Sequence, residues 1–361
     1  MIAKTGRICI LLPVSNKDIC RGDDACGSEP RLLTANNHFI SNANKHSSSN
    51  VLIHQGAARI YMNRFQANAL LLAAAIIWGT TFVVQQVGTG GLEAITFTGI
   101  RMLVGACFIM PVAIRQYRKV NTQSHQFTIV DWLGIFLTGF ILFTAAALQQ
   151  YGIFHTTVTN AGFLTALYVP LVPIIAFLLF KRRAHWSVWP ASICCVVGTY
   201  VMTGAEKIEL QAGDLWVISS SLFWALHVIF VGRMASRTKA PLVVACGQFL
   251  ACGASGMVIG LLVEQPVLAD FSGALFGILY AGLLSTGIGF TLQVVAQRFT
   301  HEADAAIILS SETVFAACSG FIFLGERLSL TQMTGAVLIF AGIIAVQLLP
   351  MLRRSAKALV S

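Results

Sequence analysis

Ten long apolar segments follow one another along this chain, and they restrict its fold more than any other feature of the sequence. A helix of about 20 residues crosses a hydrocarbon core about 30 Å thick, and each segment is about that long. The segments are predicted at 68–87, 94–114, 132–152, 159–180, 187–204, 213–232, 241–263, 271–294, 303–324 and 330–350. Only 11% of the residues are charged, against about a quarter in soluble domains, which excludes most soluble enzyme classes. We therefore predict an all-α polytopic membrane protein with ten transmembrane helices.

The other residues form a long leader, short connectors and a short tail. Residues 1–61 are rich in Asn, Ser and His, a composition that cannot bury enough apolar surface to fold alone. We predict that this leader is disordered, and that Met62, just before the first segment, is the native start of translation. The rest is predicted to comprise a first repeat at 66–204, a second repeat at 213–350 and a cytoplasmic tail at 351–361.

The positively charged residues give an independent test of the helix count. With the N-terminus inside, the inward loops and flanks hold fifteen lysines and arginines, whereas the outward loops hold only Lys207 and Arg327. This positive-inside bias predicts a multi-pass protein of the cell inner membrane with both termini in the cytoplasm. Anchoring beside anionic lipid explains the net charge of +9 better than binding to nucleic acid.

The first five segments resemble the last five. Ile77-Trp78-Gly79 in the first matches Phe223-Trp224-Ala225 in the sixth, and Leu148-Gln149 in the third matches Leu292-Gln293 in the eighth. Because five is an odd number, the second repeat must enter the membrane from the opposite side. Many secondary transporters use such inverted repeats to place a substrate site between the halves, although a duplication without transport gives the same pattern.

Four stretches of the sequence carry a family resemblance. They are Ile77 to Phe82 (IWGTTF), Gly99-Ile100-Arg101, Thr157 to Leu164 (TVTNAGFL), and Ser311 to Ala317 (SETVFAA) followed by Gly325 to Ser329 (GERLS). In order and spacing they resemble the EamA family of the drug/metabolite transporter superfamily, over residues 66–350. The chain departs from that family at Thr313, where proline is frequent, and at 181–183, where Lys-Arg-Arg replaces Gly-Glu-Arg. The resemblance implies a permease for a small metabolite, an amino acid-like compound or a drug-like cation, with export favoured over uptake.

Two charged residues lie deep in the apolar segments. A charge at the bilayer centre costs at least about 2.5–3.5 kcal/mol, so each needs a compensating role. Glu312, near the middle of the ninth segment, is a candidate site for a proton or a cationic group. Arg101, in the second segment, is a candidate for binding an anionic group or pairing with an acid. A structural ion pair, or an Arg101 side chain reaching the outer interface, is the alternative.

Several uncharged side chains are candidates for lining a substrate cavity, with ordinary helix packing as the alternative for each. They are Trp78, Thr81, Gln85, Gln149, Trp224 and Gln293. His227, three residues after Trp224, is a candidate proton relay or a hydrogen-bonded packing residue. At the inner mouth of the eighth and ninth segments, Arg298, Glu302 and Asp304 are candidates for a solvated gate or a loop salt bridge.

Prolines and glycines mark places where helices bend or approach closely. Pro170 and Pro173 are predicted to bend the fourth segment, because proline lacks the N–H that the helix needs. Gly256-x-x-x-Gly260 and Gly273-x-x-x-Gly277 allow close helix contacts, either within the chain or in a possible homodimer.

The sequence contains no motif that indicates catalysis. It has no P-loop, no zinc-protease motif, no esterase elbow and no Cys/His cluster, so we predict neither enzyme activity nor a metal or cofactor. We predict a secondary active transporter whose halves rock to expose a small solute alternately, driven by protons through Glu312 or by exchange. The alternatives are a non-transporting sensor or assembly subunit, and an uptake or exchange carrier. A polar cavity lined by Trp78, Gln85, Trp224 and Glu312 would favour transport, whereas a dry, closed interface there would favour a sensor or subunit.

Overall fold

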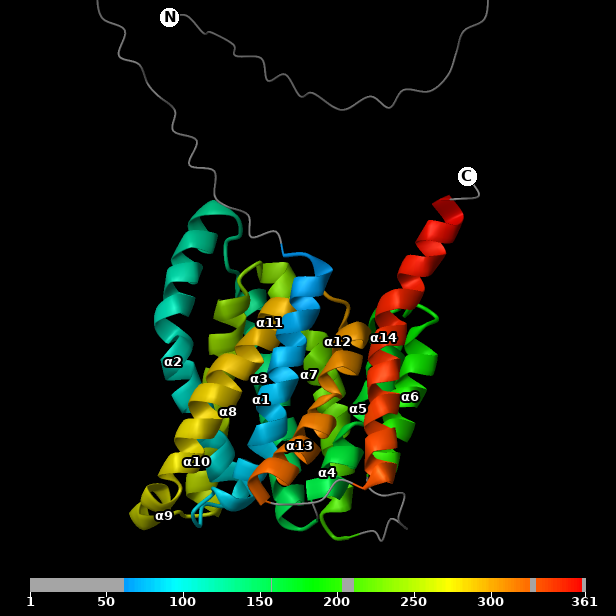
Figure 1. The fold of residues 1–361 in the computed structure, drawn as a ribbon. Coiled ribbons are helices and arrows are strands. Elements are labelled where there is room, and N and C mark those ends of the chain that lie inside the picture. Colours follow the sequence, from blue (N-terminus) through cyan, green and yellow to red (C-terminus); the bar gives the residue numbers. More distant parts are fainter. Residues whose placement is uncertain (1–61, 157, 203–210, 325–328, 359–361) are drawn as a thin grey trace, which may run out of the picture. The chain divides into compact units, whose positions relative to one another are not determined.

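The computed structural model describes residues 62–156, 158–202, 211–324 and 329–358 (Figure 1). The predictions for the leader at 1–61, and for the outward loops that carry Lys207 and Arg327, lie outside the described residues. Within the described part all regular structure is helical, which confirms the all-α fold.

Each of the ten predicted segments is a helix or a broken helix. The first repeat comprises α1 (Arg64–Val87), α2 (Ala94–Gln123), α3 (Ile129–Phe154), α4 (Val158–Thr165), α5 (Tyr168–Phe180) and α6 (Val188–Met202). The second comprises α7 (Asp214–Thr238), α8 (Pro241–Val263), α9 (Leu268–Gly273), α10 (Leu275–Leu279), the π-helix η1 (Tyr280–Phe290), α11 (Thr291–Gln297), α12 (Glu302–Leu309), α13 (Glu312–Leu324) and α14 (Leu330–Ala358). Among these residues, nine spans are long and apolar enough to cross a membrane, and the 15-residue α6 is a shorter apolar helix.

Several helices are longer than the apolar segments that predict them. α2 continues from residue 114 to Gln123, and α7 from residue 232 to Thr238. The hydropathy pattern marks only the membrane core, whereas Arg, Lys and Gln continue a helix readily beyond it. α1 begins at Arg64 because Asn63 and Gln66 form a capping box, in which the Asn63 side chain accepts the Gln66 N–H at 2.8 Å.

The fourth span breaks one turn before its first proline. α4 ends at Thr165 and α5 begins at Tyr168, while Pro173 lies inside α5 without ending it. Pro170 has no N–H to offer the carbonyl of Ala166, which instead accepts the N–H of Val169 at 3.0 Å. The bend predicted for this segment is therefore a break between two helices.

The ninth span breaks at the corresponding place without any proline. Ser310 and Ser311 separate α12 from α13, and their hydroxyls donate to the carbonyls of Ile307 and Ile308, each at 2.7 Å. Serine side chains that bond to the backbone in this way compete with helix continuation. Glu312, expected near the middle of a continuous helix, is instead the first residue of α13.

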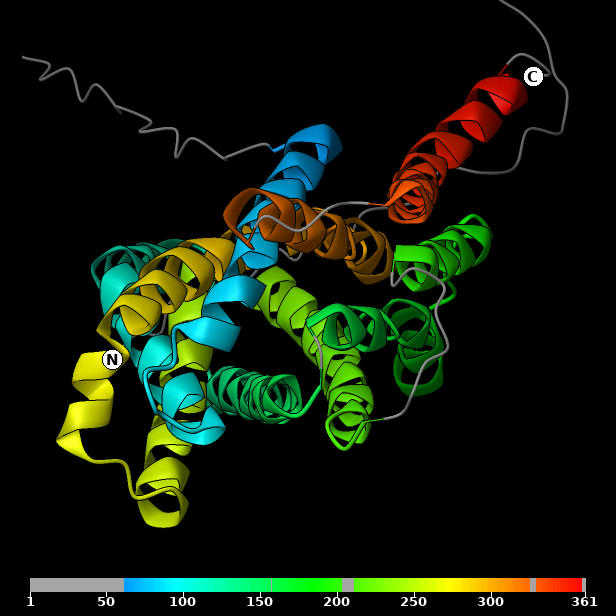
Figure 2. The same ribbon diagram turned by 60° about the horizontal axis from the view of Figure 1, so that its bottom comes forward.

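The helices that pack most extensively come from different repeats (Figures 1 and 2). α2 lies against α8 and η1, α3 against α7 and α8, α1 against α13 and η1, and α6 against α14. Glycines permit the closest crossings: a Cβ at Gly99 would come within 2.6 Å of the backbone of α8, and one at Gly256 equally close to Gly99. Gly273 and Gly277 face Gly90 and Gly88 in the same manner. The small-residue motifs are thus used inside the chain, between the two repeats.

Gly99→Ala is expected to lower thermal stability, because the added methyl would meet backbone atoms of α8, which cannot move aside as a side chain can. Overpacking of this kind typically costs about 1–3 kcal/mol. The matched control is Gly232→Ala in α7, where the nearest atom to an added Cβ is 3.8 Å away. Thermal unfolding of the purified variants in detergent checks this, and equal melting temperatures for the two would contradict the packing described.

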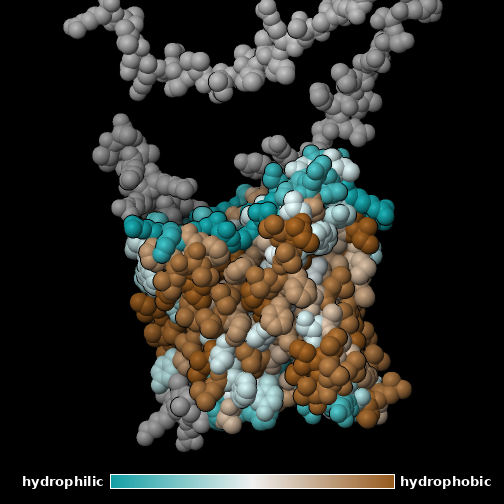
Figure 3. Space-filling model, turned by 180° about the vertical axis from the view of Figure 1, so that it is seen from behind, coloured by the Kyte–Doolittle hydropathy of each residue, from teal (hydrophilic) through white to brown (hydrophobic). Residues whose placement is uncertain are grey.

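The surface of the bundle separates into an apolar band and a polar end. Figure 3 shows brown side chains around the sides and teal ones gathered at the top, which is the end where α1 begins and α2 and α7 finish. Large apolar side chains such as Phe136, Leu262 and Phe276 are exposed in the band. We call the teal end, which carries Arg64 and Arg237, the basic end. It is the end that the positive-inside pattern predicts to be cytoplasmic.

Candidate functional site

A buried cavity lies between the two repeats, with about 530 Å³ of space not filled by atoms, including its opening. Its lining consists of Trp78, Phe82, Gln85, Arg101, Gln149, Thr165, Tyr168, Trp224, Val228, Ser285, Phe290, Gln293, Leu309 and Glu312. We call it the central cavity. Seven of the nine predicted substrate or proton sites line it, from both repeats.

Arg101 and Glu312 line this cavity without an ion-pair or hydrogen-bond partner among the described residues. Their exposed fractions are only 3% and 8%, and neither has a salt bridge or a side-chain hydrogen bond to any other described residue. The Phe97 ring lies near the guanidinium, with its centroid 5.9 Å from the guanidinium carbon. A buried charge usually has an opposite charge beside it, because desolvation costs several kcal/mol, on the order of the whole stability of many proteins. Two such charges in one cavity offer binding partners to an anionic and a cationic group.

Neutral polar atoms in the central cavity are divided between bonded and unbonded. Gln149 donates to the Thr165 hydroxyl at 2.9 Å, and Trp78 donates to the Ser285 carbonyl at 3.3 Å. In contrast, the indole nitrogen of Trp224 and the side-chain oxygen of Gln293 have no partner among the described residues. Buried polar atoms are normally satisfied, so these two atoms mark positions where a ligand or water would bond.

Aromatic rings form one side of the cavity around Phe290. The Phe290 ring centroid lies 4.6 Å from that of Trp78 and 6.0 Å from that of Trp224, with the Trp224 ring nearly parallel. Trp78 and Trp224 are the repeat-related tryptophans, so the two repeats each contribute one indole to this cluster. Aromatic faces of this kind can pack on apolar groups or attract a cation.

Two predicted site residues do not line the cavity. The Thr81 hydroxyl donates to the Ile77 carbonyl of its own helix at 2.8 Å and is buried. His227 is fully buried behind the rings of Trp224 and Phe290, and its Nε2 lies 3.0 Å from Gln248 on α8. Three residues of helix turn His227 far enough from Trp224 that it meets α8 instead of the cavity.

The residues predicted as a gate take part in contacts across the basic end. Asp304 pairs with Arg64 of α1 at 2.6 Å, and Glu302 pairs with Arg182, just after α5, at 2.8 Å. Arg298 pairs with no described carboxylate and instead donates to the carbonyl of Lys239 at 3.3 Å. Both ion pairs join the first repeat to the second. Asp304 is buried, so this contact is less solvated than a loop salt bridge would be.

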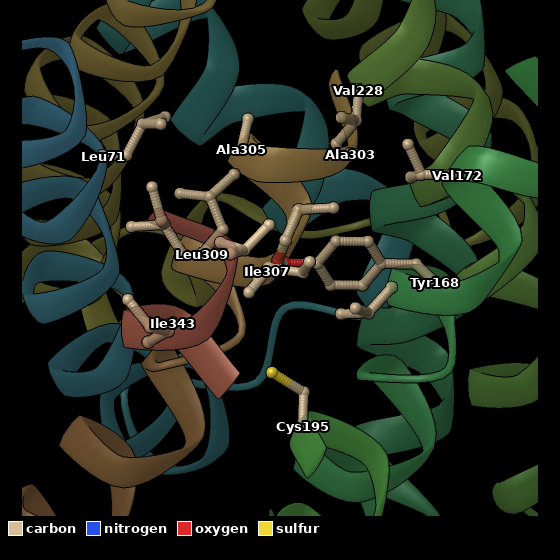
Figure 4. Close-up of a cluster of buried hydrophobic side chains, with 14 of the residues drawn as sticks. Leu71, Tyr168, Val172, Cys195, Val228, Ala303, Ala305, Ile307, Leu309 and Ile343 are labelled. Atoms are coloured by element: carbon tan, nitrogen blue, oxygen red, sulfur yellow. Dashed lines mark hydrogen bonds between the residues drawn. The ribbon is translucent and has the colours of Figure 1, made fainter. Parts of the chain in front are cut away.

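Buried apolar side chains, which Figure 4 shows and which we call the apolar plug, lie on the helices that carry both the cavity lining and these ion pairs. It comprises Leu71, Tyr168, Val228, Ile307 and Leu309, all buried in one hydrophobic cluster. The Tyr168 ring points toward α12, where its hydroxyl donates to the Ala306 carbonyl at 3.2 Å. Tyr168, Val228 and Leu309 line the central cavity, whereas Ala303 and Asp304, earlier on α12, line a hollow at the basic end. These buried residues therefore lie between the lining of the central cavity and the hollow at the basic end.

Comparison with known proteins identifies the family. The profile of the EamA-like transporter family matches residues 66–204 and 211–348, which are the two five-span repeats. The chain belongs to the EamA-like transporter family. The family resemblance seen in the sequence is thus confirmed. The protein is a membrane transporter of two repeats rather than an enzyme, and its substrate is a small molecule that crosses a lipid bilayer.

Relatives of this EamA-like transporter carry transporter names. An uncharacterized transporter of Archaeoglobus fulgidus is 28% identical over 81% of this chain and 88% of the relative, and the uncharacterized transporter YwfM of Bacillus subtilis is 25% identical over 80% and 96%. The threonine/homoserine exporter RhtA of Escherichia coli is 27% identical over 45% of this chain and 54% of RhtA. A solved crystal structure with 17% identity has the same fold, with a TM-score of 0.64 over 80% of this chain and 98% of that chain.

Some lining residues of the EamA-like cavity are absent from the sequence-based prediction. They are Phe82, Thr165, Tyr168, Val228, Ser285, Phe290 and Leu309. Tyr168 and Leu309 adjoin the helix breaks of the fourth and ninth spans, so the proline signal at Pro170 points to that region. Phe290 ends the π-helix η1, whose wider turns change the direction of its side chains relative to an α-helix, and the sequence gives no signal for this π-helix.

Proposed function

We propose that this EamA-like transporter is a secondary active transporter that exports an amino acid-like solute across the inner membrane. The observation that carries the proposal is that Arg101 and Glu312, a basic and an acidic side chain with no ion-pair partner among the described residues, line one buried cavity between the repeats. A solute with a carboxylate and an ammonium group on the same small molecule complements both charges. A simple drug-like cation would satisfy only Glu312 and would be repelled by Arg101.

The comparison with RhtA supports this substrate class. RhtA is named as an exporter of threonine and homoserine, and both compounds carry an α-carboxylate and an α-ammonium group. Their side-chain hydroxyls are also suited to the unbonded atoms of Trp224 and Gln293 in the central cavity.

In the proposed mechanism the substrate carboxylate binds the Arg101 guanidinium through charge-assisted hydrogen bonds. Glu312 carries a proton when the cavity is empty and gives it up when the substrate ammonium binds. Proton and substrate thus occupy Glu312 alternately, which couples export of the solute to entry of a proton. The rings of Trp78, Trp224 and Phe290 contact the remainder of the substrate.

Alternating access requires the basic end, proposed to be cytoplasmic, to open and close. The ion pairs Arg64–Asp304 and Arg182–Glu302 hold the repeats together there, and the apolar plug lies beneath them. We propose that these two pairs are the inner gate, and that they break when the repeats rock apart to admit substrate. Their partners come from different repeats, as a gate between rocking halves requires.

The double variant Glu302→Gln/Asp304→Asn is expected to open the inner gate more often. The arginine of each pair is partly exposed, so each pair is worth about 1 kcal/mol or less, and loss of both shifts the open population by up to about thirtyfold. The measurement is labelling of a cysteine at Val228, which lines the central cavity, by a membrane-impermeant maleimide applied from the basic end.

The control for the gate is Glu93→Gln, an exposed carboxylate just before α2, at the opposite end. It is expected to leave Val228→Cys labelling unchanged. Background from the native cysteines is subtracted with the same variants lacking Val228→Cys. Equal labelling of the double variant and the control would contradict the gate.

A non-transporting sensor or assembly subunit is the rival function. The cavity contains Trp78, Gln85, Trp224 and Glu312 together with unbonded polar atoms, which favours transport over a dry interface. The experiment that tests the proposal is metabolite profiling of cells and medium with overexpressed wild type, Glu312→Gln and Glu93→Gln. Export is supported if an amino acid accumulates in the medium with wild type and with Glu93→Gln but not with Glu312→Gln. Depletion of a compound from the medium would indicate uptake instead of export. If no compound differs between the three proteins, the sensor or subunit is favoured.

A further inference from the structure

A second cavity opens at the basic end, on the other side of the Arg182–Glu302 pair from the hollow beside Asp304. It contains about 1680 Å³ of space not filled by atoms, including its mouth, and lies among α3, α5, α7, α11 and α12. Its lining includes four arginines, namely Arg182, Arg233, Arg237 and Arg298, with Glu302 as the single carboxylate among the lining residues. We call this cavity the basic vestibule.

Two of the four arginines are already paired. Arg182 bonds to Glu302 at 2.8 Å, and Arg237 bonds at 2.6 Å to Asp131, which also caps α3. Arg233 and Arg298 have no salt bridge to any carboxylate in the described part of the chain. The vestibule therefore has a net positive charge that the described residues do not neutralise.

Both unpaired arginines are held in place. The Arg233 guanidinium stacks on the Phe180 ring, with its carbon 3.9 Å from the ring centroid, and Arg298 donates to the Lys239 carbonyl. Partial burial lowers the pKa of Arg298 from its usual value, which means that its charged form lacks some of the solvation it has in water. An anion beside it would supply that missing stabilisation.

Neutral polar groups in the vestibule also lack partners. The Thr300 hydroxyl is buried without a hydrogen bond to any described residue, and so is the side-chain oxygen of Gln297. Gln297 is 97% buried, and its nitrogen donates to the Val228 carbonyl at 3.0 Å. Because Val228 lines the central cavity, this bond lies in the wall between the two cavities. An open donor at Thr300 beside unpaired guanidinium groups is suited to an oxyanion.

We propose that the basic vestibule is an anion-binding site, in which Arg233, Arg298 and the Thr300 hydroxyl hold a carboxylate or phosphate group. The site stands on its own contacts, but its role in transport rests on the proposed function: it would collect substrate carboxylates at the basic end before they reach Arg101. A free solute and an anionic lipid headgroup present the same chemistry, and the test distinguishes them.

The test uses the purified full-length protein and the double variant Arg233→Gln/Arg298→Gln. Binding of inorganic phosphate and of acetate is measured by calorimetry in neutral detergent at low ionic strength. A second arm measures binding of labelled phosphatidylglycerol to protein in phosphatidylcholine nanodiscs. The matched control is Arg115→Gln/Arg118→Gln, which removes two exposed arginines from the end of α2, at the same end of the bundle but outside the vestibule.

The expected result is anion binding by wild type that weakens about tenfold or more in Arg233→Gln/Arg298→Gln and is unchanged in the control. If phosphate and acetate show this pattern, the site takes free solutes; if only phosphatidylglycerol does, it takes a lipid headgroup. Wild-type protein that binds none of the three, or equal weakening in both double variants, overturns the proposal. Helicity measured by circular dichroism verifies that the variants fold. No transport is measured, so this result is independent of whether the proposed function holds.

Discussion

Arg101→Gln is expected to reduce transport of the exported amino acid about a hundredfold while leaving the protein at least as stable as wild type. The transport loss follows because the variant removes the cation that binds the substrate carboxylate. Stability should not fall, since the variant replaces a buried charge that has no partner among the described residues with a neutral amide. Initial rates in proteoliposomes and thermal unfolding of the same preparations give the two values.

Two further variants separate binding from structure at Arg101. Arg101→Lys keeps the charge but loses the two-pronged geometry, so its rate should fall between those of wild type and Arg101→Gln. Arg115→Gln removes an exposed arginine from the same helix and should leave transport unchanged. If Arg101→Gln lost much of its stability and Arg115→Gln lost as much, helix α2 would tolerate neither change. The loss of transport in Arg101→Gln would then reflect damaged structure, which contradicts a substrate role.

Glu312→Gln is expected to abolish the pH dependence of transport as well as most of its rate. In the proposed exchange a proton enters as the solute leaves, so acidifying the outer side accelerates wild-type export. Glutamine cannot carry that proton, so export by the variant should not respond to a pH difference. The loss of rate is expected to be about a hundredfold, because the substrate ammonium loses its buried carboxylate. Export is measured from proteoliposomes at equal and unequal pH.

The matched control for this change is Glu93→Gln, which makes the same substitution at an exposed position. It should keep both the rate and the pH response. Pure exchange predicts instead that wild-type transport is indifferent to pH from the outset. If export by Glu312→Gln still became faster when the outer side was acidified, Glu312 would not be the group that couples proton entry to export.

The positions of the ten spans along the sequence could be predicted because hydropathy determines which segments enter a membrane. The interruptions within the spans were predicted only in part. Pro170 signalled the break between α4 and α5, because a missing N–H is visible in the sequence. The break at Ser310 and Ser311 and the π-helix η1 carry no such signal, since both depend on how the backbone bonds in its tertiary setting.

The central cavity could be predicted where a residue is costly in lipid. Arg101, Glu312 and the glutamines stood out because polar groups in an apolar segment require a partner. Phe290 and Tyr168 could not be recognised in this way, because aromatic side chains are found equally against lipid, in a core and in a cavity. Helical spacing from Trp78 predicts Thr81 in the cavity, and His227 is a candidate because it is a histidine inside an apolar segment. The rotation of each helix about its axis, which the sequence does not give, turns both side chains away from the cavity.

Counterflow in proteoliposomes tests the central claim most directly. Vesicles containing the purified transporter are loaded with a mixture of the proteinogenic amino acids and homoserine, and entry of each labelled compound against that load is compared with protein-free vesicles. The account predicts accelerated entry of at least one zwitterionic amino acid by wild type, and none by the double variant Arg101→Gln/Glu312→Gln. It would be contradicted if no amino acid entered faster than in protein-free vesicles, or if the double variant matched wild type.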